Sequence, residues 1–162
     1  MEAQGTGLVS HVGHHHQGPQ GDAASGLKPR GILPPACCHQ VGQLPPGQPA
    51  LHQVDFSWEG YQWIDFHDVD NTILSFMRRA RDASDFVIVV ANFTPVPREG
   101  YRVGVPKAGF YREILNSDAA CFGGSNLGNA GGLPSDPMPW QGQPHSILLT
   151  VPPLAVVYFK PE

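Results

Sequence analysis

An uninterrupted apolar run from Phe86 to Ala91 constrains the fold more than any other stretch of this sequence. Most of its residues are aromatic or β-branched, which are types that favour strands over helices. The following segment, Thr94–Pro97, ends the strand, because proline lacks a backbone N–H and disfavours helical angles at the residue before it. A strand without polar positions must be covered on both faces. We therefore predict that this run lies at the centre of a packed sheet, with the rings of Phe86 and Phe93 in the core.

Shorter strand-like segments flank this central run and are separated by turn signals about every ten residues. The preceding segment, Asn71–Arg79, is joined to it by the polar turn Arg81–Asp85, which predicts a hairpin. The segments that follow are Tyr101–Val105, Phe110–Leu115, and a closing pair made of Ser146–Val151 and Leu154–Lys160. This pattern is typical of an antiparallel β-sandwich. The predicted fold class is therefore all-β.

Three connecting stretches are predicted to form no strand. Leu51–Asp55 is interpreted as a short helical or irregular segment, and Glu99-Gly100 as a turn before the strand at Tyr101. Asn116–Pro139 is rich in Gly, Pro, Ser and Asn, which are residues that dominate turns, so it is assigned no regular structure. Within it, the Gly123–Gly132 loop lacks the Gly-Lys-Ser/Thr ending through which a P-loop holds phosphate.

Composition divides the chain sharply near Pro49. Residues 1–49 contain no Phe, Trp or Tyr, so all 8 Phe, 3 Trp and 4 Tyr residues lie downstream. A segment without aromatics that is interrupted by Gly and Pro buries too little apolar surface to offset an ordering entropy of about 1–2 kcal/mol per residue. We interpret residues 1–48 as a disordered Gly/Pro/His-rich tail and residues 49–162 as the folded domain.

The charge of the chain argues against nucleic acid as a partner. Its net charge of -4 opposes binding to phosphates, which requires a clustered basic surface. The basic cluster Arg78, Arg79 and Arg81 is interrupted by an apolar residue and is interpreted as a solvated strand end.

The cysteines and the hydropathy pattern indicate a cytoplasmic protein. Cys37 and Cys38 are adjacent and Cys121 is left over, which does not make a disulfide framework and favours a reducing compartment. No window reaches the roughly 18–20 apolar residues of a membrane span, and the N-terminus lacks the pattern of a secretory signal. We expect a cytoplasmic location and no membrane partner.

Two groups of residues contain the residue types of a metal site or a catalytic triad but lack the spacing or motif of such a site. His14–His16 and Cys37–His39 contain metal-binding types, but adjacent ligands do not match the spacings at which zinc ligands converge on one ion. Asp118, His145 and Ser146 are the residue types of a catalytic triad, but no Gly-x-Ser-x-Gly elbow supports one. The sequence thus predicts no metal site, no cofactor and no catalytic residue.

Four aromatic residues near predicted turns, Trp58, Tyr61, Trp63 and Trp140, are candidates for carbohydrate binding, because aromatic rings stack on the apolar faces of pyranose sugars. The alternative is that the same rings pack in the core or against another domain. An aromatic side chain buries about 150–250 Å² and dominates interfaces. We favour packing and retain carbohydrate binding as the alternative.

Seven motifs between residues 49 and 162 resemble the C-terminal domain of bacterial 1,4-α-glucan (glycogen) branching enzymes, which are members of the α-amylase superfamily. They occur in the order of that family and cover the whole predicted domain. The motifs are Pro49–His52, Gly60–Asp65, Asn92–Arg98, Tyr101–Pro106, Leu115–Asp118, Gly123–Asn129, and Pro144–Ser146 with Pro152–Ala155. Seven ordered motifs over this length are a specific signal.

The resemblance implies an antiparallel, Greek-key-like β-sandwich of the α-amylase C-terminal type, which follows a catalytic (β/α)8 barrel of about 250 residues. In that family the aspartate nucleophile, the glutamate acid/base and a second aspartate lie on the barrel, which the resemblance does not cover. It therefore implies a non-catalytic fragment, whose partner is the barrel of a branching enzyme. The alternative partner is α-glucan or glycogen. Residues 1–48, where the resemblance is lost, are interpreted as the product of a shifted reading frame or a mis-set start.

Asp65, Asp68 and Asp70 form the dense acidic group of the predicted domain. Retaining glycosyl transfer requires two carboxyl groups about 5–5.5 Å apart that flank the bond. We expect these three aspartates to lie instead in a solvent-exposed turn, as turn and cap residues. Their spacing also differs from the pattern of a calcium-binding loop.

Overall fold

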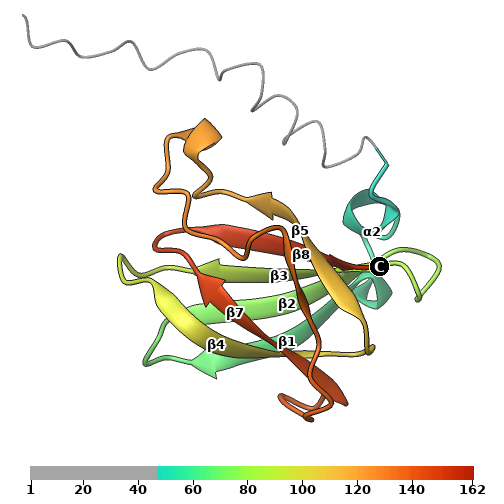
Figure 1. Cartoon of the computed structure of the whole chain (residues 1–162). Coiled ribbons are helices and arrows are strands. Elements are labelled where there is room, and N and C mark those ends of the chain that lie inside the picture. Colours follow the sequence, from blue (N-terminus) through green and yellow to red (C-terminus); the bar gives the residue numbers. More distant parts are fainter. Residues whose placement is uncertain (1–46) are drawn as a thin grey trace, which may run out of the picture. The chain divides into compact units, whose positions relative to one another are not determined.

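Strands dominate residues 47–162, which are the residues that the computed structural model describes (Figure 1). The elements, in chain order, are the short helix α2 (Pro49–His52), the 3-10 turn η1 (Trp58–Gly60), strands β1 (Tyr61–Asp68), β2 (Ile73–Arg79), β3 (Phe86–Asn92), β4 (Arg98–Val105) and β5 (Phe110–Asn116), the 3-10 turn η2 (Ala120–Phe122), and strands β6 (Gly132–Pro134), β7 (His145–Val151) and β8 (Val156–Pro161). The all-β prediction is confirmed.

The strands pair into two antiparallel sheets. The larger sheet has the order β1-β2-β3-β8-β5-β6, and β4 pairs with β7 in the smaller sheet. The β4–β7 pair crosses in front of the larger sheet in Figure 1, so the two sheets form the layers of a sandwich. We call the face of the larger sheet that is turned toward β4 and β7 its inner side, and the opposite face its outer side.

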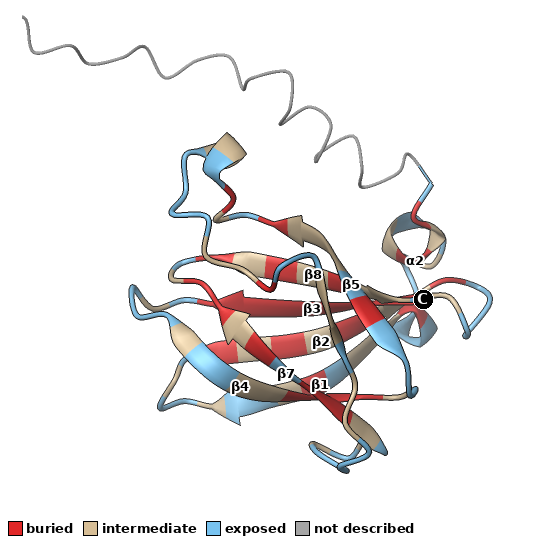
Figure 2. Ribbon diagram, in the orientation of Figure 1, coloured by how far each residue is buried: buried red, intermediate tan, exposed pale blue. Residues whose placement is uncertain are grey.

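The central apolar run forms β3, which lies between β2 and β8. All seven of its residues are buried, and Figure 2 shows this strand buried along its entire length. Strand β2 pairs with it in register, from Ile73 opposite Asn92 to Arg79 opposite Phe86. The predicted hairpin and the predicted central position of this run are both confirmed.

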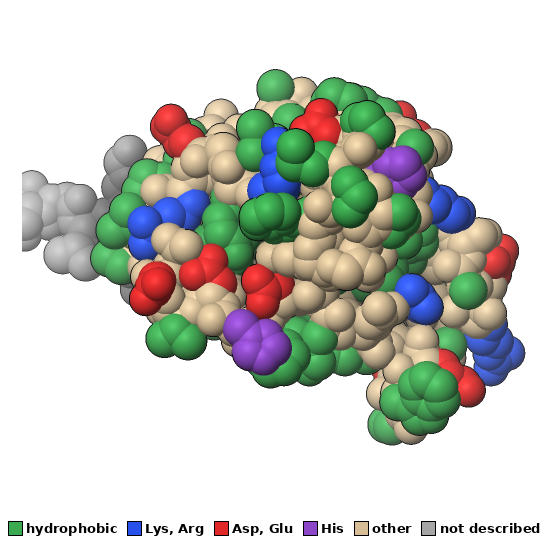
Figure 3. All heavy atoms as spheres, turned by 90° about the horizontal axis from the view of Figure 1, so that it is seen from below, with side chains coloured by type: hydrophobic (Ala, Val, Ile, Leu, Met, Phe, Trp, Pro, Cys, Tyr) green, Lys and Arg blue, Asp and Glu red, His purple; other side chains and the backbone are tan. Residues whose placement is uncertain are grey.

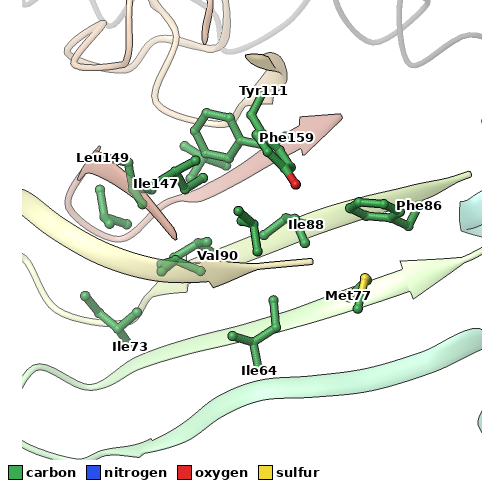
Figure 4. Close-up of a cluster of buried hydrophobic side chains, with 14 residues drawn as sticks. Ile64, Ile73, Met77, Phe86, Ile88, Val90, Tyr111, Ile147, Leu149 and Phe159 are labelled. Carbon is green, nitrogen blue, oxygen red and sulfur yellow. The ribbon is translucent and has the colours of Figure 1, made fainter. Parts of the chain in front are cut away.

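The main hydrophobic core lies on the inner side of the larger sheet. Alternate residues of β3, namely Phe86, Ile88 and Val90, point into it, as the two-residue period of a strand requires. The other strands contribute Ile64, Ile73, Met77, Val103, Val105, Tyr111, Ile147, Leu149, Val151, Val157 and Phe159. Figure 4 shows these side chains converging between the two layers.

A second, smaller cluster lies on the outer side of the same sheet. Val87 and Val89 of β3 pack there with Ala50 of α2 and with Ala80, which follows β2. All four residues are buried. The strand is thus covered on both faces, as its unbroken apolar pattern predicts.

The prediction of a closing pair is wrong, because β7 and β8 belong to different sheets. Strand β7 pairs with β4, whereas β8 lies between β3 and β5. The connection between them, Pro152–Ala155, contains two prolines that lack the N–H groups of a hairpin ladder. Asn92 fixes the crossing, because its side-chain amide donates a hydrogen bond of 3.0 Å to the carbonyl of Pro152. The chain therefore passes from one layer to the other at this point.

Three predicted connections have different bounds in the structure. Glu99-Gly100 lies inside β4, where an irregular register after Arg98 accommodates it. The stretch Asn116–Pro139 contains η2 and β6, and β6 pairs with β5. The helical segment begins at Pro49 rather than Leu51, in agreement with the preference of proline for the first helical turn.

Phe93 is not a core residue, contrary to the prediction. Its side chain is 57% exposed, whereas that of Phe86 is 1% exposed. Strand β3 ends at Asn92, whose side-chain oxygen accepts hydrogen bonds of 2.9 and 2.8 Å from the backbone N–H and the hydroxyl of Thr94. The chain turns at once, so Phe93 lies beyond the edge of the packed layer.

The predicted tail, residues 1–48, lies outside the described residues except for Gly47 and Gln48. The interpretations given to His14–His16 and Cys37–His39 fall outside them as well. Gln48 is buried, and its side-chain oxygen accepts a hydrogen bond from the ammonium group of Lys160 in β8. The described part of the chain therefore contacts the larger sheet before α2 begins. Between residues 47 and 162, no helix is long and apolar enough to cross a bilayer.

Candidate functional site

Two of the three aspartates of the acidic group lie in strand β1 and not in the predicted turn. Asp65 and Asp68 are strand residues next to register shifts in the β1–β2 pairing, and Asp70 alone lies in the turn. Asp65 accepts a hydrogen bond of 2.8 Å from the side-chain amide of Gln141. Asp68 accepts one of 2.8 Å from the hydroxyl of Tyr101. Both carboxylates therefore connect β1 to segments from the second half of the chain.

Hydrogen bonding sets the charge of the Asp68–Tyr101 contact. Partial burial raises the pKa of Asp68, but hydrogen bonds from Asn71 and Tyr101 outweigh it and hold the pKa below its ordinary value. Burial, reinforced by the neighbouring Asp68 carboxylate, raises the pKa of Tyr101. At neutral pH a neutral phenol thus donates to an ionised carboxylate. A carboxyl group held ionised in this way does not suit the role of a general acid in glycosyl transfer.

Asp118, His145 and Ser146 do not form a catalytic triad. The hydroxyl of the fully buried Ser146 donates to the carbonyl of Met138 and accepts from the guanidinium of Arg102, both at 2.8 Å. No hydrogen bond joins Ser146 to His145 within the described residues. The serine hydroxyl is therefore part of a structural network between β7, β4 and the loop that precedes β7.

The Gly123–Gly132 loop folds around the carboxylate of Asp118. That carboxylate accepts hydrogen bonds from the backbone N–H groups of Ser125 at 3.0 Å and Leu127 at 3.1 Å. Burial raises the pKa of Asp118, but the bonds from these two residues outweigh it and hold the pKa below its ordinary value. A Cβ atom on Gly124 would lie 2.1 Å from the carbonyl oxygen of Asp118. A glycine is therefore required for this close approach, and the loop has a structural role.

Asn129 fastens the far end of the same loop to two strands. Its backbone and side-chain N–H groups donate to Glu113 of β5 at 3.1 and 2.7 Å. Its side-chain oxygen accepts the backbone N–H of Thr150 in β7 at 2.7 Å. Because β5 and β7 belong to different sheets, Asn129 links the two layers of the sandwich.

The structure does not bring the four predicted carbohydrate-binding aromatics together at one place. Tyr61 and Trp63 lie in β1 with their ring centroids 5.1 Å apart. Trp58 lies in η1 and is 84% exposed. Trp140 lies in a turn that its backbone closes through two hydrogen bonds with Gln143. These residues do not form one common binding platform.

Tyr61 and Trp63 belong to an apolar surface on the outer side of the larger sheet, which we call the outer face. Its exposed or half-buried members are Tyr61, Trp63, Phe66, Leu74, Phe76, Ile114, Val156 and Tyr158, around the buried Val87 and Val89. Strand alternation places the members from β2, β3 and β8 opposite the main core. On these three strands, charged side chains occupy this side only at Arg78 and Lys160, close to Gln48 and Leu51.

The aromatic rings of the outer face form one contiguous cluster. Tyr61 stacks on Phe76 with centroids 5.0 Å apart and an interplanar angle of 28°. Trp63 contacts the edge of Phe76 at 5.9 Å and lies 5.3 Å from Phe66. Trp63 and Phe66 nevertheless remain 44% and 49% exposed. The cluster is a preformed aromatic surface that the described residues cover incompletely.

Sequence reasoning missed Phe66 and Phe76 as members of this surface. Phe76 joins it because the β1–β2 register places it opposite Trp63. Phe66 is three residues after Trp63, and in a regular strand the two side chains would point to opposite sides. The register shifts in β1 bring both to the same side. The alternation of Leu74 and Phe76 was the one signal that could have indicated this face.

The segment between α2 and η1 extends the apolar surface. Asp55 forms an ion pair with Arg78 of β2, which holds this segment beside the outer side of the sheet. The next residue, Phe56, is fully exposed. A fully exposed phenylalanine beside a half-covered aromatic cluster increases the apolar area that faces solvent.

An open cleft of about 450 Å³ lies between this segment and the end of β2. It is lined by Val54, Trp58, Glu59, Tyr61, Gln62, Arg79, Ala80, Arg81 and Ala83. Two of the four predicted aromatics, Trp58 and Tyr61, are therefore brought to one concave site, together with polar side chains. From the sequence, Arg79 and Arg81 were interpreted only as part of a solvated strand end, and their place beside a cleft was not predicted.

The described part of the chain contains no candidate metal centre, and the face shown in Figure 3 has no broad charged surface. Between residues 47 and 162, no three His, Cys, Asp or Glu side chains are grouped to hold an ion. On the face shown in Figure 3, acidic and basic side chains are interspersed, and apolar side chains form separate groups. This face lacks the clustered basic surface that phosphate binding requires.

Comparisons with known proteins identify relatives of this chain. Residues 63–162 match the family model "Alpha amylase, C-terminal all-beta domain". The chain is 52% identical to the 1,4-alpha-glucan branching enzyme GlgB of Aquifex aeolicus over 113 residues, which are 70% of this chain and 18% of that protein. The corresponding enzyme of Methylobacillus flagellatus is 56% identical over 113 residues, with coverages of 70% and 15%. That of Nitrosomonas europaea is 50% identical over 131 residues, with coverages of 81% and 17%.

The match concerns one part of these relatives. The chain spans less than a fifth of the length of each of them. The family model covers more than half of this chain, and its description as all-β agrees with the two antiparallel sheets. The chain belongs to the family of α-amylase C-terminal all-β domains, in the form found in 1,4-α-glucan branching enzymes.

Proposed function

We propose that residues 49–162 are the non-catalytic C-terminal domain of a 1,4-α-glucan branching enzyme of glycogen biosynthesis, and that this domain supports a catalytic (β/α)8 barrel. The observation that carries the proposal is the outer face, whose aromatic rings are only half covered. In the relatives the matched domain is less than a fifth of the protein, so other parts of those proteins are available to cover such a surface.

The outer face has the aromatic composition expected of a contact between domains. Contacts between domains of one chain bury about 600–1,500 Å², and each aromatic side chain offers about 150–250 Å². Trp63 and Phe66 keep almost half of their surface exposed, and the neighbouring Phe56 keeps all of it, so this area is available to such a contact. Single exposed apolar residues are common on protein surfaces, but a contiguous aromatic patch marks an interaction site.

In this proposal the chain has no branching activity of its own. Cleavage of an α-1,4 linkage and transfer of the chain to a 6-hydroxyl are assigned to the barrel. The positions of two aspartates support this assignment. Asp65 accepts a hydrogen bond from Gln141, and Asp68 accepts one from Tyr101. These carboxylates therefore do not surround an open site. The location of the protein is proposed to be cytoplasmic.

A complementation assay tests the proposal. The full chain is assayed for branching of amylose, first alone and then mixed with a branching enzyme truncated before its C-terminal domain. We expect activity only in the mixture. Trp63→Ala should reduce the restored activity at least tenfold. Trp140→Ala is the matched control, because Trp140 is 47% exposed, close to the value for Trp63, but lies in a turn beside Gly104 of β4, in the smaller sheet.

Each other outcome contradicts a stated part of the proposal. Branching by the chain alone would overturn the non-catalytic assignment. Equal restoration by both variants would overturn the assignment of the contact to the outer face. A mixture that stays inactive at every concentration tested would overturn the supporting role.

A second proposed function is that of a stand-alone α-glucan-binding module. One observation favours it, namely that Trp58 and Tyr61 line the same cleft. Trp63 is part of the outer face and Trp140 lies apart, so they are not needed for it. A glycogen-affinity gel provides the test: retardation of the full chain supports the function, and unchanged mobility contradicts it.

A further inference from the structure

Opposite charges lie at the two ends of the aromatic cluster on the outer face. Strand β1 begins at Tyr61, opposite Arg78 of β2, and ends at Asp68. The turn beside the first end carries Arg81, and the turn beside the second end carries Asp70. Both of these turn residues are exposed. The β1–β2 pair therefore presents a basic side chain at one end and an acidic side chain at the other.

Other charged side chains near these ends are already bonded within the domain. Arg78 forms an ion pair with Asp55. The carboxylate of Asp82 accepts a backbone N–H from within its own turn at 2.8 Å. Arg81 and Asp70, in contrast, take part in none of the ion pairs found between residues 47 and 162. These two exposed charges are therefore available to a partner molecule.

The half-exposed rings of the cluster lie midway between the two ends. Trp63 is two residues after Tyr61, and Phe66 is two residues before Asp68. Trp63 and Phe66 lie 5.3 Å apart by their ring centroids and are 44% and 49% exposed. When this surface is turned end for end, its apolar centre stays in place and its end charges exchange sign. This is the self-complementarity that an interface about a twofold axis requires.

Strand β1 is also an edge of the larger sheet, but its geometry does not favour the addition of a further strand. Its register with β2 shifts between Trp63 and Asp65 and again between Asp65 and Asp68. Such irregularities bend an edge strand and interrupt the hydrogen-bond ladder that a second chain would need. The face of the sheet is therefore better suited to association than its edge.

We infer that two copies of this chain associate through their outer faces, about a twofold axis that sets the two β1–β2 pairs antiparallel. Trp63 and Phe66 of each copy pack on the same rings of the other at the centre. At each rim, Arg81 of one copy lies beside Asp70 of the other, and these charges fix the register of the contact. The second copy covers the surface that the proposed function assigns to a barrel, so the dimer forms when no barrel is bound.

Sedimentation velocity of the full chain over a range of concentrations tests the inference, and we expect a monomer–dimer equilibrium. Arg81→Asp and Asp70→Arg should each weaken the dimer about tenfold, because both rims of the dimer then hold two like charges. The double variant Arg81→Asp/Asp70→Arg should restore the affinity, since each rim again holds one charge of each sign. Both residues are exposed in turns, so the replacements leave the fold intact, which circular dichroism verifies.

The outcomes separate this inference from the proposed support of a barrel. A chain that stays monomeric at every concentration overturns the inference alone, because the complementation assay measures the support of a barrel independently. Larger aggregates without a discrete dimer overturn it as well. A double variant that associates as weakly as the single variants overturns the antiparallel arrangement and with it the inference. Restoration by the double variant supports the inference, because non-specific apolar association does not depend on which residue carries which charge.

Discussion

The two sides of strand β3 are equally apolar, but the described chain covers them unequally. On the inner side, Phe86 and its neighbours are sealed by β4 and β7 within the main core. On the outer side, Val89 is buried, yet the surrounding Phe76 is only half-buried and Trp63 is exposed. An unbroken apolar strand indicates that both faces need cover. The difference between the faces shows that the described residues cover the inner side fully and the outer side only in part.

The largest expected effect concerns the sealed side. Phe86→Ala should lower the free energy of unfolding by about 3–5 kcal/mol, because a fully buried ring is replaced by a cavity. Phe93→Ala removes the same ring from an exposed position and should cost less than about 1 kcal/mol. Urea denaturation of both variants measures the difference. Equal losses at the two positions would show that the inner side is not the main source of stability.

A smaller effect is expected on the half-covered side. Trp63→Ala removes ring contacts with Tyr61, Phe66 and Phe76, so it should cost about 1.5 kcal/mol, which is the lower value of about 0.5 kcal/mol for each of the three aromatic pairs at this half-exposed position. The same substitution should reduce self-association, because an exposed apolar patch drives association when its cover is absent. Sedimentation velocity over a range of concentrations measures this.

The comparison with Trp140→Ala sharpens this second prediction. That variant removes an indole of similar exposure outside the outer face, so it should leave self-association unchanged. Association that decreases equally in both variants would contradict the assignment of the outer face as the associating surface.

The parts of the fold that follow local patterns were predictable from the sequence. The apolar run of β3 and the short polar turn before it define the β2–β3 hairpin, because both signals lie within a few residues. The partner of β7 was not predictable in this way. Pro152 and Pro153 indicate a break, but they do not tell whether the chain returns to the same sheet or crosses to the other one.

The candidate site, too, is predictable from the sequence only where its residues follow a local pattern. Trp58 and Tyr61 are close in sequence, and Gly60 between them marks the turn that brings them to one cleft. Phe66 reaches the outer face only through register shifts in β1, which depend on the pairing with β2. Side-chain direction after such a shift follows from tertiary pairing, and no local sequence pattern specifies it.

The smallest predicted effect concerns the edge of the sandwich. There the hydroxyl of Tyr101 in β4 donates a hydrogen bond to Asp68 of β1, and this contact joins the two sheets. The folded-state pKa of Asp68 lies below its ordinary value of 3.8. Its ionised form therefore stabilises the fold above that pH, and the contribution is lost as the pH falls through the lower folded-state value.

Asp68→Asn should accordingly destabilise the domain at pH 7 and have a smaller effect at pH 3, where less of this contribution remains. Urea denaturation of both proteins at the two pH values gives the difference. Tyr101→Phe provides a matched control, since it removes the hydroxyl that donates to the same carboxylate, so its cost should also shrink as the pH falls. An Asp68→Asn cost that is equal at both pH values would mean that the contact acts through shape and not through charge. The contact would then join β1 to β4 without any dependence on pH.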